Sequence, residues 1–155
     1  MEKPSSIVEF ALSRINTEQF AIIDKAFREG APVEVNTNLR FGVDRANRVV
    51  AVYSQFQYEQ EHIPFLKVEL VIQFVIAETS WQPFLRDEVT TIIPKGFLVH
   101  LAMIAVGTAR GVLHSKTEGT RFNEFFLPTI NVAEMVKEDG VFVESSQPKN
   151  RERPI

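Results

Sequence analysis

Three histidines are the first candidates for metal or acid–base chemistry in this 155-residue chain. His100 and His114 fall on one predicted helix, about 21 Å apart along its axis at about 1.5 Å per residue, so one ion cannot bind both within a chain. No third ligand stands at helical spacing from either, and metal ligands come in clusters. His114 in the last turn suits the negative end of the helix dipole. We therefore expect surface or capping histidines, with no metal and no cofactor.

Nucleophilic and paired-carboxylate chemistry also lack their signatures. Asp87 and Glu88 are adjacent, and neighbours in sequence do not face each other on a helix or strand, so we expect a solvated loop. Phosphate-binding glycine loops, the serine nucleophile elbow and the zinc-protease motif are absent. The chain has no cysteine, which excludes thiol catalysis, disulfide scaffolds and cysteine zinc sites. We predict a protein that is not an enzyme and has no catalytic residues.

Charge and hydropathy exclude further classes. Lys and Arg number 17 against 20 for Asp and Glu, a formal net charge of -3, so no excess cation is available to neutralise nucleic-acid phosphates. Glu9 and Arg14 interrupt the N-terminal apolar stretch too early for a signal-peptide core. The apolar stretch 97–106 is shorter than the roughly 20 residues of a membrane span. We expect a cytoplasmic protein with neither nucleic-acid binding nor membrane insertion.

Phenylalanine is the unusual component, with 13 Phe against 2 Tyr and 1 Trp. A Phe side chain offers apolar area and no polar tip. Two interpretations stay open: these residues close the core, or they form an apolar groove for extended nonpolar polypeptide segments. The candidates for polypeptide binding are Ile22, Ile23, Phe27, Phe56, Tyr58, Phe122, Phe125, Phe126, Leu127 and Ile130.

The elements that position these residues begin with three segments of period-two alternation, 33–43, 48–59 and 66–76. This pattern predicts strands with one buried face. The polar turn 44–47 and the connection 61–64 are short, so the three strands form an antiparallel meander. Residues 7–22 fit either a helix or a strand, and 24–32 is a longer connection able to cross over the sheet.

From Pro94 the apolar spacing changes to three and four residues, which predicts one long helix ending near 116–119. A short helix follows at about 132–136, and the polar tail 145–155 is predicted to be disordered. Glycine in a helix costs about 1 kcal/mol against alanine, so we expect a close-packed partner to offset Gly107 and Gly111. The candidates for an oligomer interface are Leu98, Leu101, Ala105, Gly107, Thr108, Arg110 and Gly111.

The order of these elements over 8–136 resembles the SecB family of export chaperones. The matching residues are 65–69 with Phe74 in the last strand, Arg110 in the long helix, and 127–132, which begins Leu-Pro and contains Asn131.

The resemblance implies an α+β fold in a single domain, 1–144. It implies a four-stranded antiparallel sheet with a long crossover after the first strand, a long C-terminal helix packed on the sheet and a short final helix. By analogy 7–22 then becomes a strand. The resemblance further implies a dimer of dimers, assembled partly through the long helices.

In function, the resemblance implies binding of unfolded polypeptides in apolar grooves and their delivery to the translocase motor SecA. The family's Pro-Tyr before the helix arginine is replaced here by 107–109. Its acidic docking face for SecA is diluted by Arg40, Lys67 and Gln73. A SecB-like chaperone with another delivery partner, such as the antitoxin-associated relatives, therefore stays open.

Two rivals come from other classes. A hotdog-like acyl thioesterase also packs a long helix on an antiparallel sheet, with His62 or His100 as its polar candidate, but it requires the helix early in the strand order. A plain oligomerisation module without a groove is the other rival, and binding of a hydrophobic dye would contradict it.

Overall fold

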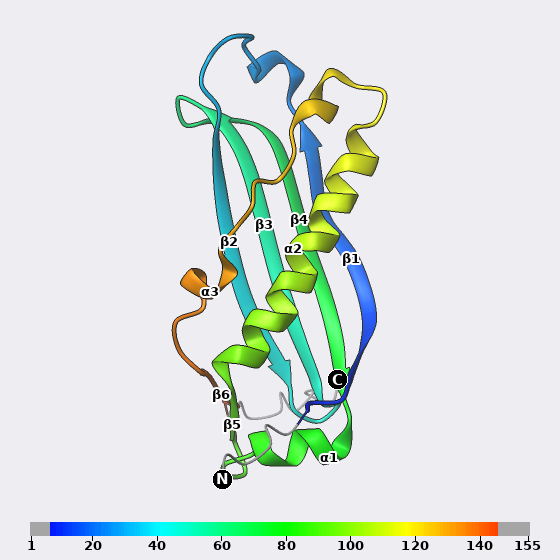
Figure 1. Cartoon of the computed structure of the whole chain (residues 1–155), viewed down its shortest axis with the longest axis vertical. Helices are drawn as coiled ribbons and strands as arrows, with labels where there is room; N and C mark the ends of the chain where they lie inside the picture. Colours follow the sequence, from blue (N-terminus) through cyan, green and yellow to red (C-terminus); the bar gives the residue numbers. More distant parts are fainter. Residues whose placement is uncertain (1–6, 146–155) are drawn as a thin grey trace, which may run out of the picture.

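A four-stranded antiparallel sheet with one long helix across one of its faces makes up most of the molecule (Figure 1). The computed structural model describes residues 7–145, so nearly all of the tail predicted to be disordered lies outside the described residues. The α+β prediction, with its four-stranded sheet, long helix and short final helix, is confirmed. The strands are β1 (Phe10–Ile22), β2 (Glu34–Asp44), β3 (Val49–Gln60) and β4 (Ile63–Ile76).

The sheet order is β1-β4-β3-β2, and every neighbouring pair is antiparallel. The ambiguous N-terminal segment is a strand because its backbone pairs with β4 from Phe10↔Ile76 to Ile22↔Leu66. Since β1 and β2 lie at opposite edges, residues 23–33 cross one end of the sheet between them (Figure 1). This is the predicted long crossover.

Two tight connections set the registers of the meander. The β2–β3 hairpin turns through 45–48 and pairs Asp44 with Val49. The β3–β4 turn consists of two residues, Glu61 and His62, with φ of 49° and 65°. Two left-handed residues match the twist of the flanking strands in such a turn. Alternate side chains therefore point to a core face and an outer face, with a register shift near the turn, where Tyr58 pairs with Leu66 and Glu59 with Pro64.

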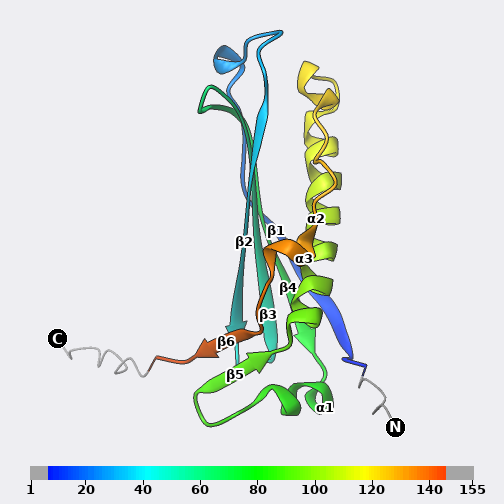
Figure 2. The same cartoon turned by 60° about the vertical axis from the view of Figure 1, so that its left-hand side comes forward.

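Helix α2 (Lys95–Thr117) covers the core face of the sheet (Figure 2). Its side chains Leu98, Leu101, Ala105 and Ala109 are buried against the sheet, as their spacing predicts, and Leu113 is buried as well. The helix follows all four strands, whereas the hotdog rival requires it early in the strand order.

The sequence analysis took 97–106 as the apolar stretch and judged it too short for a membrane span, but the apolar segment of α2 is longer. Helix α2 has 23 residues, with a mean hydropathy of 1.6 over 18 of them, so by length and composition alone it is long enough to cross a membrane. The core helix of a soluble protein meets the same criterion, and 39% of that window is buried inside the chain.

A second, two-stranded sheet was not predicted. It pairs β5 with β6, and 4-residue strands are too short to show a period. Asp87, in the loop before β5, is exposed as expected, and backbone N–H groups of Val89 and Thr90 donate to it. The remaining elements are α1 (Glu78–Trp81), β5 (Thr90–Ile93), α3 (Val132–Met135) and β6 (Gly140–Val143), with 3-10 turns at Asp24–Ala26, Gln82–Phe84 and Arg121–Glu124.

Candidate polypeptide-binding surface

Phe27 of the crossover meets the phenylalanines of the segment 122–125 at the crossover end of the sheet. Phe27 of the crossover has its ring centroid 4.9 Å from Phe65, 5.3 Å from Phe122 and 5.7 Å from Phe125. Tyr58 lies 5.9 Å from Phe125. We call these five residues the aromatic cluster. Segments about a hundred residues apart in the chain therefore build one apolar body, whose geometries are mainly tilted or edge-to-face, as aromatic pairs prefer.

Arg121 covers the exposed side of the aromatic cluster. Its guanidinium carbon lies 4.8 Å from the Phe27 ring centroid and 5.1 Å from that of Phe122. Its Nη2 donates to Oδ1 of Asp24 at 2.6 Å. The crossover is thereby tied to the segment that follows α2.

Burial divides the predicted polypeptide-binding residues into three groups. Phe56, Tyr58, Phe122 and Leu127 are buried, so they serve the core in this conformation. The half-buried members are Ile22, Phe27, Phe125 and Ile130. Only Ile23 and Phe126 are exposed, by 47% and 61%. The buried members therefore belong to the core, and polypeptide binding stays a prediction for the half-buried and exposed members.

Two hydroxyl groups on the core face of β3 have no hydrogen-bond partner among the described residues: Ser54 Oγ and Tyr58 OH. Burial raises the pKa of the Tyr58 hydroxyl, and the positive charge of Arg110 opposes that effect. Arg110 itself lies near the carbonyls of Leu127 and Pro128, at 3.5 and 3.4 Å. Unsatisfied buried hydroxyls are costly, and here they lie between the sheet and its cover.

A groove of about 370 Å³, with apolar side chains and the charged residues Arg40, Lys137 and Glu138 along its walls, lies between β2 and the returning segment 135–142. We call it the β2 groove. Leu39 and Phe41 line it from β2, and Leu98 lines it from α2. Met135 and Val141, which also line it, are exposed by 39% and 62%. The sequence analysis identified the alternating apolar side chains of β2. It did not predict that residues 135–142 pack beside them, because the place where a distant segment packs leaves no periodic signal in the sequence.

The predicted oligomer-interface residues also separate by burial. Leu98, Leu101 and Ala105 are at most 2% exposed, since they face the sheet of their own chain. A second chain cannot contact these three side chains unless α2 moves away from its own sheet. The predicted interface is therefore reduced to Gly107, Thr108, Arg110 and Gly111. Thr108 and Arg110 are half-buried. Gly107 and Gly111 are exposed, and an added Cβ at either would meet nothing within 4 Å.

His100 and His114 lie at the surface of α2. The His100 ring meets the edge of Phe10 at 5.7 Å between centroids. His114 Nε2 lies 3.5 Å from Glu118, and its ring stacks on Phe126 at 6.2 Å.

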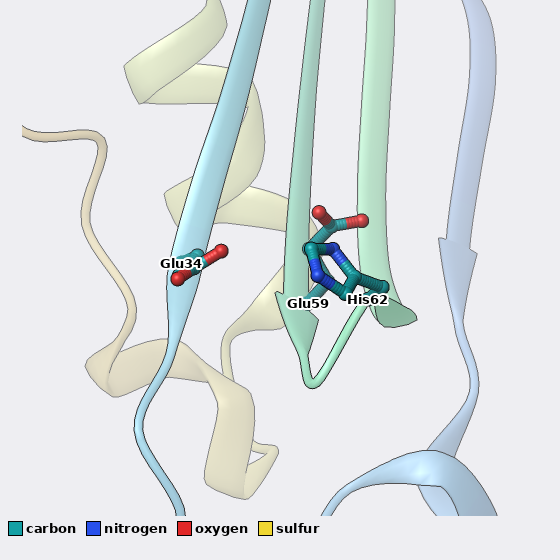
Figure 3. Close-up of side chains that lie close together, drawn as sticks. All are labelled: Glu34, Glu59 and His62. Atoms are coloured by element: carbon teal, nitrogen blue, oxygen red, sulfur yellow. The ribbon is translucent and has the colours of Figure 1, made fainter.

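His62 has a different environment, beside Glu34 and Glu59 (Figure 3). Potential ligand atoms of these three residues all lie within 4.8 Å of one another. The sequence analysis missed this trio. Its predicted turn 44–47 would pair Val43 with Arg48 and place Glu34 opposite Gln57. In the structure Asp44 pairs with Val49, and this register places Glu34 opposite Glu59, two residues before the next turn.

Comparisons with known proteins give a likeness in structure and none in sequence. No family model matches the chain. No curated protein matches it in sequence. The structure is similar to that of the Mycobacterium tuberculosis Rv1957 SecB-like chaperone in complex with a ChAD peptide from the Rv1956 HigA1 antitoxin. The TM-score is 0.40 and the identity 10%, over 80% of this chain and 89% of that chain. A likeness at this level does not establish a shared function.

Proposed function

We propose that this protein binds extended, apolar segments of nonnative polypeptides and holds them without catalysing a reaction. The observation that supports this function is the β2 groove, a hollow with an apolar wall beside an edge strand. Met135 and Val141 expose apolar side chains along its wall, and Arg40, Lys137 and Glu138 add charged groups at its border.

The edge position of β2 supplies the second requirement for binding a polypeptide. Within the described residues, β2 pairs only with β3, so its other side offers unpaired backbone N–H and C=O groups. An extended segment can add to such an edge through main-chain hydrogen bonds, while alternate side chains enter adjacent apolar hollows. This mode selects extended, nonpolar chains rather than one particular sequence.

The outer rim of the aromatic cluster offers a further contact. Phe126 and Ile23 are exposed, and Phe27 and Phe125 are half-buried beside them. A bound segment longer than the β2 groove would gain apolar contact there, because burial of apolar area contributes about 25 cal/mol per Å².

The test is suppression of aggregation of a chemically denatured client, followed by light scattering with the full chain. Val141→Glu places a charge in the β2 groove at an exposed position, so the fold should tolerate it. Leu12→Glu, 45% exposed on the opposite edge strand, is the matched control. We expect Val141→Glu to weaken suppression several-fold and Leu12→Glu to preserve it. No suppression by the unmodified protein, or equal loss in both variants, would contradict the proposal.

The cellular setting of this activity is a further part of the proposal. We propose a cytoplasmic homo-oligomer, a dimer of dimers, that hands its client to the SecA motor. The uncrowded glycine face of α2 supports the assembly. Sedimentation gives the solution mass, and a pull-down with client-loaded protein tests SecA directly. Capture of a different receiver in place of SecA would replace the handover partner and leave the β2 groove as the client site.

A further inference from the structure

We propose that Glu34, Glu59 and His62 bind one divalent ion of the zinc class, linking β2 to the β3–β4 turn. Glu34 belongs to β2, Glu59 to the end of β3, and His62 to the two-residue turn (Figure 3). The site lies on the outer face of the sheet, away from α2, and it does not depend on polypeptide binding.

The geometry is within reach of a single ion. Potential ligand atoms of the trio lie within 4.8 Å of one another. Zinc bonds to nitrogen and oxygen are about 2.0–2.2 Å, so ligand atoms around one ion lie roughly 3.5 Å apart. Glu34 and His62 are exposed, so their side chains can close the remaining distance by rotation.

The electrostatics of the pair provide an independent reason to expect a cation. Glu34 and Glu59 are direct cross-strand partners, an arrangement that is destabilising for like charges. Glu59 is only 6% exposed. Within residues 7–145 no Lys or Arg forms an ion pair with either carboxylate. A buried carboxylate without a cationic partner is costly, and a bound ion would remove both penalties.

Neutral amides already orient the buried carboxylate. Asn36 Nδ2 donates to Oε1 of Glu59, and Gln57 Nε2 donates to its Oε2 at 3.0 Å. A carboxylate has about four acceptor positions, so two remain for a metal. Hydrogen bonds of this kind fix ligand orientation in metal sites, where their loss costs about 10–100-fold in affinity.

The donor set selects the class of ion. One imidazole and two carboxylates match the nitrogen and oxygen ligands of zinc sites with three protein ligands, which leave a position for water. Calcium takes six to eight oxygen ligands, and magnesium keeps several waters in an octahedral shell. The imidazole therefore favours a transition ion of the zinc class over both.

Titration of the full-length, metal-free protein with zinc chloride in a calorimeter tests the proposal, with thermal unfolding as the second readout. We expect one ion per chain and a higher Tm with zinc. Glu34→Gln and His62→Asn should each weaken binding at least about tenfold, since each removes one of three ligands. Asparagine tolerates the positive φ of the turn, so His62→Asn preserves the hairpin while removing the imidazole.

Two controls separate this site from loose surface binding. Glu61→Gln removes a neighbouring charge from the same turn, and a His100→Asn, His114→Asn double variant removes the other imidazoles; both should bind zinc as the unmodified chain does. Circular dichroism of every variant establishes folding before titration. Absence of zinc binding in the unmodified chain, or loss of binding in the controls rather than in Glu34→Gln and His62→Asn, would overturn the assignment.

Discussion

Arg121 and Asp24 lie 97 residues apart in sequence, yet Nε and Nη2 of Arg121 both donate to Oδ1 of Asp24, at 3.0 and 2.6 Å. The guanidinium lies over Phe27 and Phe122 at the same time. One side chain therefore both ties the crossover to the segment after α2 and covers the aromatic cluster. Both partners are largely exposed, so the pair itself adds little stability, about 0–1 kcal/mol.

Replacing Arg121 with alanine should open the aromatic cluster more than it unfolds the protein. We expect a loss of about 1 kcal/mol in the free energy of unfolding, from the ion pair and the cation–π contacts. Fluorescence of a hydrophobic dye should rise in the variant under native conditions. Arg121→Lys keeps the charge beside Asp24, so its dye fluorescence should lie between those of the unmodified chain and Arg121→Ala. Unchanged dye binding in Arg121→Ala would contradict the covering role.

Phe126 is the phenylalanine whose replacement reports on binding alone. It is 61% exposed, so Phe126→Ser should change stability by less than about 0.5 kcal/mol while lowering affinity for an apolar peptide. Phe125 packs against Phe27, Phe65 and Tyr58. Phe125→Ser should therefore cost about 3 kcal/mol or more. Urea unfolding and peptide fluorescence anisotropy, measured on both variants, separate the two effects; equal stability losses would be the contrary result.

Tyr58→Phe removes a buried hydroxyl that has no partner. An unsatisfied buried polar group costs about 1–3 kcal/mol, so we expect the variant to be more stable than the unmodified chain at pH 7, by about 1 kcal/mol. Urea unfolding measures the difference. A loss of stability would indicate that the hydroxyl does have a partner.

The same hydroxyl predicts a pH dependence. Burial raises its pKa in the folded chain above the ordinary value of 10.0. The unfolded chain then releases this proton first, so stability is unaffected below pH 10 and falls as pH rises above it. Unfolding at pH 8 and pH 11 should show a smaller decline for Tyr58→Phe than for the unmodified chain.

Two glycines should respond in opposite ways to the same substitution. At Gly140 a new Cβ would lie 2.6 Å from Phe142 Cε2 and 2.9 Å from Leu98 Cδ1. We expect Gly140→Ala to destabilise by about 1–3 kcal/mol. At Gly107 the space is open, so Gly107→Ala should stabilise the helix by about 1 kcal/mol.

Sedimentation of Gly107→Ala also tests the assembly. A second chain packed closely on this face has no room for the added methyl group, so the variant should dissociate at higher concentration than the unmodified protein. An unchanged association constant would show that Gly107 does not lie in the interface.

The meander and the long helix could be predicted because their signals are local. Alternation across 33–43 and 66–76 continues over enough residues to identify a face, and both strands are present. The register was not predicted correctly, because the turn 44–47 implies that Glu34 opposes Gln57, whereas the observed pairing of Asp44 with Val49 places it opposite Glu59. Periodicity could not decide β1, because register shifts between Leu12 and Arg14 and between Thr17 and Gln19 interrupt its alternation.

The candidate site was less accessible to sequence analysis. Composition located the phenylalanines, but it could not distinguish Phe122, which is buried, from Phe126, which is exposed and four residues later. The β2 groove depends on where 135–142 returns to the sheet, and nothing in the spacing of that segment specifies a docking position.

The strand order has a consequence for biosynthesis. Strand β1 leaves the ribosome first, yet its only partner in the described sheet is β4, and the whole β2–β3 hairpin must be made before β4 exists. During that interval the nascent chain carries an unpaired strand with apolar side chains, the kind of segment that aggregates. A protein proposed to shelter such strands in others thus passes through the same vulnerable state at each synthesis.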